Sequence, residues 1–339
     1  TQRCQDFLLV ITDAGNNASN LKGKVSIAEG LTTADVVKYF GTLGYDDNGR
    51  GVVSNSEAEL TQTTIDSTIT GNYTFTHDIN NINTTNTEAI KLGADNYNLD
   101  ATGKVVNINV TSDSGTNALV YDSGTKRNAK LNVNANDISI ALNAAGNASA
   151  VSVVGYNTTT FNSDMDIIAK TTAGNHVTGI YLGKNSYSYN KAIINGNLTM
   201  RDGEDGYGVT NGNTIGNTID ANYNVAGIDV NCFDLDIKGL IDLKVDGTGL
   251  VVRNSASDSG RVNIKGGSIE VNRNPVEGIY NYAIEAYNGG KNIQFNSSAA
   301  SDVLVNIKGN IGLLTPGRSG NILNLGLANA ESSWTGVMH

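Results

Sequence analysis

The sequence predicts an all-β protein, a right-handed parallel β-helix with an N-terminal cap that contains one short helix. Two observations carry this prediction. Short segments that alternate apolar and polar residues recur from about residue 100 onward, and the composition suits stacked coils with tight corners. Asparagine accounts for 47 of the 339 residues and glycine for 39, but proline for only 2. Asparagine and glycine tolerate left-handed corner backbone, whereas proline would remove hydrogen-bond donors from a sheet.

The N-terminal region lacks the regular repeat. Residues 1–60 are expected to form the cap and residues 61–339 the β-helix. A stacked fold needs such a cover because its open end exposes both the core and the strand edges. The helix of the cap is expected at residues 32–40, with a threonine as N-cap and a glycine at its end. A small separate domain is the alternative for this region.

The repeat itself is read from isoleucines in similar strand contexts. They follow one another at steps of 27, 43, 27 and 43 residues, and they are Ile167, Ile194, Ile237, Ile264 and Ile307. A unit of this size cannot bury its own apolar face, whereas stacked copies bury a continuous column. We therefore expect these isoleucines to form one interior file, with inward asparagines bonded to one another between coils. The longer steps are expected to hold an extra turn or a protruding loop, and residues 202–207 are one candidate.

Charge and hydropathy narrow the function classes. The net charge is −10 and the basic residues are scattered singly, which speaks against nucleic acid as a partner. No apolar run approaches the length of a membrane helix, so no membrane insertion is expected. No signal peptide is recognised, so we expect the chain to begin after processing or as an excised piece. Cys4 and Cys232 have no spacing signature, and a disulfide between them is left open, with two unpaired thiols favoured.

Candidate groups for nucleophilic catalysis are few. His77, His176 and His339 are too scattered for a metal cluster or a catalytic triad. The serine-rich turns at residues 112–115 and 257–260 faintly resemble a serine-protease nucleophile loop. They lack the leading glycine and a histidine partner, so they are interpreted as ordinary turns.

Carboxylates are the other catalytic candidates. Asp229, Asp234 and Asp236 lie close together in the sequence, as do Asp242 and Asp246. Strand alternation places Asp234 and Asp236 on one outward face, where two carboxylates can reach the separation of about 5 to 9.5 Å that glycoside hydrolysis uses. An ordinary solvated face is the favoured interpretation, so no catalytic residue is assigned.

Two acidic loops could supply oxygen ligands to calcium, namely residues 46–48 and the loop with Asp202, Glu204 and Asp205. Neither matches a known calcium-loop spacing, so solvated turns are favoured, and no metal or cofactor is expected. Several tyrosines are expected at strand ends or loops, where a ring could stack on a sugar, although packing beside strands is favoured. They are Tyr181, Tyr187, Tyr189, Tyr207, Tyr280, Tyr282 and Tyr287.

The Asn/Gly/Thr-rich repeats of residues 60–339 close with Ser-Ser-Trp-Thr-Gly at residues 332–336. With these features the chain resembles the passenger region of bacterial type V autotransporters, in which Ser-x-Trp-Thr-Gly runs are common. The family's membrane translocator is not in the sequence, so the resemblance implies an excised fragment. It further implies secretion across the outer membrane, display on the bacterial cell surface or release from it, and no catalytic residues.

The leading functional hypothesis is a non-enzymatic bacterial surface adhesin that attaches to host or bacterial cells and can self-associate. Its expected partner is a host surface glycan or protein, or another copy of itself on a neighbouring cell. A β-helical polysaccharide lyase or hydrolase is the first alternative, and an inert stalk is the second. The sequence does not identify ligand-binding residues.

Overall fold

The structure, a computed structural model, describes nine segments and the backbone of four short strands that precede them. The segments are residues 62–183, 190–212, 224–253, 260–271, 282–287, 292–296, 302–314, 322–327 and 329–338. The chain divides into two compact units, residues 1–62 with 77–79 and residues 63–76 with 80–339. Each unit is described by itself.

The first unit contains two antiparallel strand pairs. In the first pair, β1 (Leu9–Thr12) lies beside β2 (Lys24–Ile27). In the second, β3 (Thr42–Tyr45) lies beside β4 (Gly51–Ser54). The helix expected at residues 32–40 lies outside the described residues, and the role of residues 1–60 as a cap stays a prediction.

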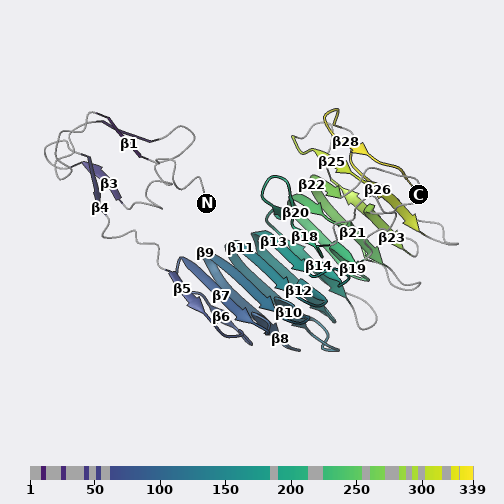
Figure 1. The fold of residues 1–339 in the computed structure, drawn as a ribbon, viewed down its shortest axis with the longest axis horizontal. Helices are drawn as coiled ribbons and strands as arrows, with labels where there is room; N and C mark the ends of the chain where they lie inside the picture. Colours follow the sequence, from purple (N-terminus) through teal and green to yellow (C-terminus); the bar gives the residue numbers. More distant parts are fainter. Residues whose placement is uncertain are drawn as a thin grey trace. The chain divides into compact units, whose positions relative to one another are not determined.

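The second unit is built from two sheets whose main strands are parallel (Figure 1). The path of the larger sheet runs through β5 (Gln62–Ile65), β7 (Ile79–Thr85), β9 (Tyr97–Ser112), β11 (Ala129–Ala144), β13 (Asn157–Thr171), β15 (Lys191–Ile194), β20 (Asp234–Val245), β22 (Val262–Val271), β24 (Asn292–Phe295) and β27 (Ile322–Asn324). The smaller sheet contains β8 (Ile90–Leu92), β10 (Leu119–Asp122), β12 (Ala148–Val154), β14 (Val177–Gly183), β19 (Val225–Asn231), β21 (Thr248–Arg253), β23 (Tyr282–Tyr287) and β26 (Asn310–Leu314).

Shorter strands join the larger sheet beside this path. They are β6 (Tyr73–Thr74), β16 (Leu198–Asp202), β17 (Gly206–Tyr207), β18 (Val209–Thr210), β25 (Val305–Lys308) and β28 (Ser333–Thr335). Of these, β16 and β17 form a small antiparallel hairpin. The hairpin includes residues 202–207, so the predicted interruption of the repeat is a β-hairpin.

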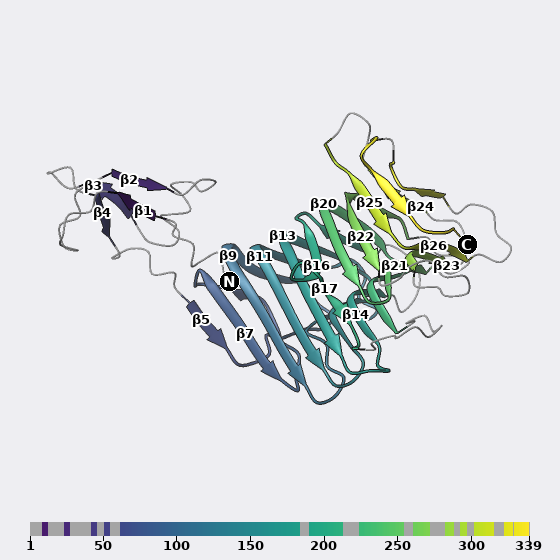
Figure 2. The ribbon, with the colours of Figure 1, turned by 45° about the horizontal axis from the view of Figure 1, so that its top comes forward.

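The chain alternates between the two sheets, and each return adds a strand beside the previous one (Figures 1 and 2). The all-β prediction is confirmed for the described residues, which contain no helix. Parallel strands need a crossover between neighbours, and here the crossover runs through the other sheet instead of a helix. Both sheets contribute side chains to one shared hydrophobic core.

The smaller sheet has one apolar file through all eight of its strands. Its members occupy one register position and are at most 2% exposed, and they are Ile90, Leu119, Val151, Ile180, Ile228, Leu250, Ile284 and Ile311. Full burial of each such side chain contributes about 1.5–3 kcal/mol. A file of this length explains how short strands of three to seven residues hold a regular sheet.

The prediction of a single file for the five isoleucines is wrong, although all five are buried. Ile194, Ile237 and Ile264 are consecutive neighbours in the larger sheet. Ile167 and Ile307 instead belong to a second file, which runs from β9 and β11 through Ile167 and reaches Ile307 by way of Ile269. The long strands carry two apolar segments, separated between β20 and β22 by a register shift, so equal steps along the chain do not always lead to the same file.

The prediction that inward asparagines are bonded to one another between coils is also wrong. Side-chain bonds between asparagines lie on the outer face, where Asn134 donates to Asn98 at 3.3 Å and Asn162 donates to Asn134 at 2.7 Å. The next rung is a bond from Asn195 to Asn162. Buried Asn157, in contrast, donates to a serine hydroxyl and a backbone carbonyl. An inward amide has to satisfy four hydrogen-bonding positions inside an apolar core, which favours the outer face for a ladder.

Candidate functional site

A column of glycines crosses the smaller sheet. Gly179, Gly227 and Gly249 occupy neighbouring strands, and a Cβ atom at Gly227 would lie 2.6 Å from the carbonyl oxygen of Gly249. The same 2.6 Å separates a Cβ at Gly179 from the Gly227 carbonyl oxygen. In a straight strand, residues three apart face opposite sides. Here Ala226 and Asp229 line the same pocket, so the alternation of side chains is interrupted between them, where Gly227 lies.

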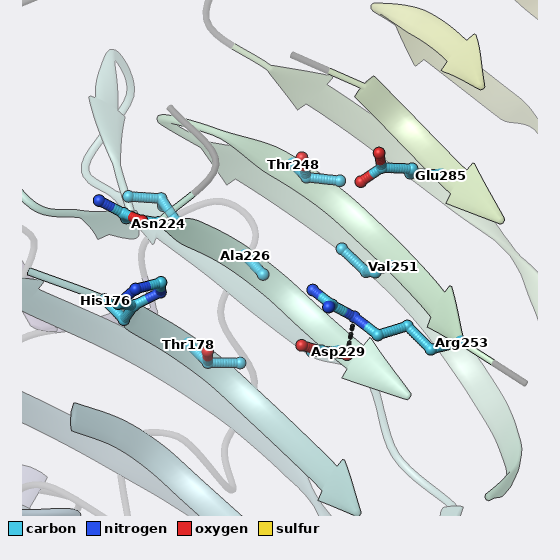
Figure 3. A pocket seen from close by; sticks show the side chains of 10 residues that line it. His176, Thr178, Asn224, Ala226, Asp229, Thr248, Val251, Arg253 and Glu285 are labelled. Atoms are coloured by element: carbon cyan, nitrogen blue, oxygen red, sulfur yellow. Dashed lines mark ion pairs between the residues drawn. The ribbon is translucent and has the colours of Figure 1, made fainter. Parts of the chain in front are cut away.

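A pocket of about 380 Å³ lies on the smaller sheet beside these glycines (Figure 3). Its residues come from β14, β19, β21 and β23 and from the positions just before β14 and β19, and they are His176, Thr178, Asn224, Val225, Ala226, Asp229, Thr248, Val251, Arg253 and Glu285. Seven of these ten are polar or charged. The pocket therefore offers hydrogen-bonding groups from four neighbouring strands.

Asp229 and Arg253 form the ion pair of this pocket (Figure 3). Arg253 Nε lies 3.3 Å from Asp229 Oδ1, and the geometry leaves that buried oxygen without a hydrogen bond. The Asp229 side chain is 14% exposed, whereas the Arg253 side chain is 50% exposed. Burial raises the pKa of the Asp229 carboxyl, and Arg253 offsets only part of this effect. The protein thus holds a carboxylate in a place that disfavours its charge.

Glu285 provides a second buried carboxylate, and its residue is 4% exposed. Asp229, Val251 and Glu285 occupy one register position in three successive strands. Neighbouring strands lie about 4.8 Å apart, so the backbones of the two acids are roughly 9–10 Å apart. In Figure 3, Val251 lies between the two acidic side chains. The pocket therefore has an apolar residue flanked by two carboxylates.

Asp229 lies near four other aspartates in the sequence, but in the structure it lines the pocket and the other four do not. Asp234 Oδ1 accepts the backbone N–H of Arg261 at 2.7 Å, and Asp236 forms an ion pair of 3.7 Å with Lys191. These two belong to the larger sheet, away from the pocket lining. Glu285, in contrast, was not singled out. A signal was available, because Ile228-Asp229-Val230 and Ile284-Glu285-Ala286 both place an acid between apolar residues.

The remaining two aspartates, Asp242 and Asp246, form hydrogen bonds between segments of the larger sheet. Asp242 accepts two hydrogen bonds from Arg201, and these bonds together with the ion pair hold the pKa of its carboxyl below the usual range. The hydroxyl of Thr210 donates to Asp246 Oδ2 at 2.8 Å. Both carboxylates therefore connect neighbouring strand segments of the larger sheet.

A shallower groove of about 490 Å³ follows the outer face of the larger sheet. It is lined by Asn197, Thr199, Leu240, Ile241, Asp242, Gly267, Ser268, Asp302, Leu304 and Asn306. Leu240 is one of its apolar residues and is 41% exposed. Ser268 Oγ donates to Asp242 Oδ1 at 2.8 Å, so part of the polar lining is already bonded internally.

The candidate histidines, serine-rich turns and cysteine lie in different parts of the chain. His176 lines the pocket, while His77 belongs to the first unit and His339 lies outside the described residues. The hydroxyl of Ser112 is hydrogen-bonded to that of Thr116 at 2.8 Å, within an ordinary turn. Residues 257–259 also lie outside the described part of the chain, as does Cys4.

The acidic loop after β16 carries an ion pair of its own, since Lys170 Nζ lies 2.6 Å from an oxygen of Asp202. Residues 46–48 are outside the described segments. Within those segments, no group of three or more His, Cys, Asp or Glu residues is arranged to hold a metal ion.

Three of the seven tyrosine candidates have side chains among the described residues, and they are Tyr181, Tyr207 and Tyr282. Tyr282 is buried, and Lys244 Nζ lies 5.7 Å from the ring centre of Tyr207. Tyr181 shares the register position of Asp229 in the neighbouring strand. The side chains of the others lie outside the described residues, namely Tyr187, Tyr189, Tyr280 and Tyr287.

Comparison with known proteins gives no relative. No family model, no curated protein and no solved structure matches the chain. We also find no apolar helix of bilayer length in the part of the chain that the structure describes.

Proposed function

We propose that this protein is a non-enzymatic adhesin of the bacterial cell surface, folded as a right-handed parallel β-helix and corresponding to an autotransporter passenger. The alternation of the chain between two parallel sheets supports the β-helix, because each coil must place one strand in each sheet. The proposed partner is a host surface glycan or protein, or a second copy of the protein on a neighbouring cell.

The observation that carries the proposal is a polar column on the outer face of the larger sheet. Its members share one register position in successive strands and are exposed or half-buried, and they are Asn107, Ser139, Asp166, Thr199, Asp242, Ser268, Asn306 and Ser333. A linear row of donors and acceptors can meet a partner at many points. Each bond contributes only about 0.5–1.5 kcal/mol, so attachment strength is set by their number.

The terminal motif supports the same fold. Residues 333–335 form β28, which pairs with β25 as a further parallel rung of the larger sheet. Trp334 donates its indole N–H to the carbonyl of Gly309 at 3.0 Å and packs against the core. The stretch on which the family resemblance rests therefore has a packing role at the last described rung.

Cell settling and bead adhesion test the proposal. Cells that display the protein, and beads coated with it, should aggregate or bind a host-cell layer. Replacement of Ser139, Thr199 and Ser268 together by lysine should reduce this attachment strongly, whereas each single replacement should have little effect. A matched control places three lysines at exposed residues outside the polar column, Asn98, Thr102 and Asn132. Attachment that is equal in both triple variants, or absent in the unmodified protein, contradicts the proposal, and the latter result indicates an inert stalk.

A polysaccharide hydrolase or lyase is the second candidate, because Asp229 and Glu285 line one pocket and burial raises the pKa of the Asp229 carboxyl. Paired carboxylates with separated pKa values are what glycoside hydrolysis uses. Release of reducing ends from neutral and acidic polysaccharides measures this activity. Turnover that is lost in Asp229→Asn and Glu285→Gln, and retained in Asp234→Ala, would replace the adhesin proposal.

A further inference from the structure

We infer that the pocket of β14, β19, β21 and β23 binds one neutral, hydroxyl-rich sugar unit of a glycan. This inference rests on the proposed adhesin function, and it assigns the glycan to a site that lies apart from the polar column of the larger sheet. The pocket combines Val251, the two carboxylates beside it and the hydroxyl and amide groups of further lining residues (Figure 3).

The spacing of the carboxylates matches a sugar ring. Asp229 and Glu285 flank Val251 in one register position, and their backbones are roughly 9–10 Å apart. A pyranose ring that rests its C–H face on Val251 directs hydroxyl groups outward from opposite ring edges. A hydrogen bond of about 2.7 Å on each side then joins a hydroxyl to each carboxylate. Val251 thus suits the apolar C–H face of a sugar ring, and the two flanking acids suit its hydroxyl groups.

The charges of the pocket favour a neutral ligand. An acidic sugar would bring its carboxylate near two acidic side chains, Asp229 and Glu285, and Arg253, the arginine among the described lining residues, is already paired with Asp229. A strongly cationic ligand would meet the same arginine. Hydroxyl groups avoid both conflicts, because they donate hydrogen bonds to carboxylates without adding charge.

Burial strengthens this interpretation. Asp229 Oδ1 is buried and lies 3.3 Å from Arg253 Nε, while the side chain as a whole is 14% exposed. A ligand hydroxyl can therefore donate a charge-assisted hydrogen bond to the exposed part of this carboxylate. Thr178, Asn224 and Thr248 add further polar groups along the rim. An apolar ligand would offer the hydroxyl and amide groups of these three residues no hydrogen bond, so we exclude that class.

Calorimetric titration of the purified protein tests the inference with three neutral disaccharides, lactose, maltose and cellobiose. Diglucosamine and digalacturonate serve as the cationic and acidic probes. We expect at least one neutral disaccharide to bind, and Glu285→Gln and Asp229→Asn each to weaken binding by about tenfold or more, because each removes a charge-assisted hydrogen bond. The matched controls are Glu270→Gln and Asp236→Asn on the larger sheet, which should bind as the unmodified protein does.

Three results overturn the inference. These are the absence of binding by all neutral probes, unchanged binding in both pocket variants, and binding of a charged probe alone. Thermal unfolding by circular dichroism shows whether a variant that fails to bind is still folded, and Val251→Arg provides a second variant that blocks the centre of the pocket. Cell adhesion is measured in parallel. Adhesion that persists without sugar binding removes the sugar site but keeps the proposed function, whereas sugar binding without adhesion does the reverse.

Discussion

Arg201 and Asp242 are joined by two parallel hydrogen bonds between β16 and β20. The Nε atom donates to Oδ2 at 2.9 Å, and Nη2 donates to Oδ1 at 2.8 Å. Ser268 of the next strand donates to the same carboxylate at 2.8 Å. Three successive strands are thereby connected on the outer face through one carboxylate, which makes Asp242 a central member of the polar column.

This arrangement predicts a loss of stability in acid. The pKa of Asp242 is lowered in the folded protein, chiefly by the hydrogen bonds from Arg201. The stabilisation is therefore present above the pKa of an ordinary aspartate, about 3.9, and it disappears as the pH falls through the lower folded value. Asp242→Asn should lower the melting temperature at pH 7 and have less effect at pH 2. Circular dichroism melts at several pH values measure this, and an equal effect at all pH values contradicts it.

The opposite pH dependence is expected for Asp229. Burial raises the pKa of its carboxyl, so the folded protein binds a proton that the unfolded chain has already released. Its stability therefore falls as the pH rises from the ordinary aspartate value through the folded one. Asp229→Asn should raise the melting temperature at pH 7, and this gain should shrink at pH 3. Asp236→Asn is the matched control, because its carboxylate has an ion pair on the larger sheet. A lower melting temperature of Asp229→Asn at pH 7 is the result that contradicts this prediction.

A stability gain on removal of a charge would also bear on function. A buried carboxylate that destabilises the fold is typical of binding and catalytic sites, where function opposes stability. The same variant is expected to lose sugar binding. The melting temperature and the sugar affinity of Asp229→Asn together test whether this carboxylate lowers stability but is needed for binding.

The glycine column predicts a third result. A methyl group at residue 227 would lie 2.6 Å from the carbonyl oxygen of Gly249 and 2.9 Å from Val245 Cγ2. Because both neighbours belong to the packed sheet, Gly227→Ala should destabilise the protein by about 1–3 kcal/mol. Gly93→Ala, where the added methyl meets no atom within 4 Å, should have little effect. Urea unfolding of the two variants makes the comparison, and equal midpoints would show that the sheet adapts to the added carbon.

The sequence predicts the strands of the larger sheet better than it predicts which strand segments are neighbours. Alternation predicted the strands around Ile194, Ile237 and Ile264, and these three are indeed stacked neighbours. The same reasoning failed for Ile307, because loops of unequal length and register shifts decide which strand segment meets which. Such shifts depend on corner geometry, for which a single sequence carries little information.

The pocket could be predicted only in part for a related reason. Asp229 was singled out as an acid near other acids, but its counterpart Glu285 lies two strands away in the sheet and far along the chain. Register alone brings these residues together. Recognition of the common context of Ile180, Ile228, Leu250 and Ile284 would have aligned the four strands and placed both acids in one position.

Adjacent residues of β13 provide the last prediction, which separates the two faces of the larger sheet. Phe161 is 1% exposed and lies in the interior file beside Ile194, whereas Asn162 is exposed and belongs to the outer asparagine ladder. Phe161→Ala should destabilise the protein by about 3–5 kcal/mol through the cavity it creates. Asn162→Ala removes exposed hydrogen bonds and should cost about 1 kcal/mol.

Urea unfolding of both variants, followed by circular dichroism, measures the difference. Because the residues are neighbours in one strand, both changes are made in the same local backbone, and the difference reports chiefly the direction in which each side chain points. A register slip of one residue would exchange the two faces. Equal destabilisation, or a larger effect at Asn162, would therefore mean that the packing of β13 differs from the one described. A small effect at Asn162 together with a large one at Phe161 would support an outer face whose residues are available for contact with a partner, since their removal leaves the fold intact.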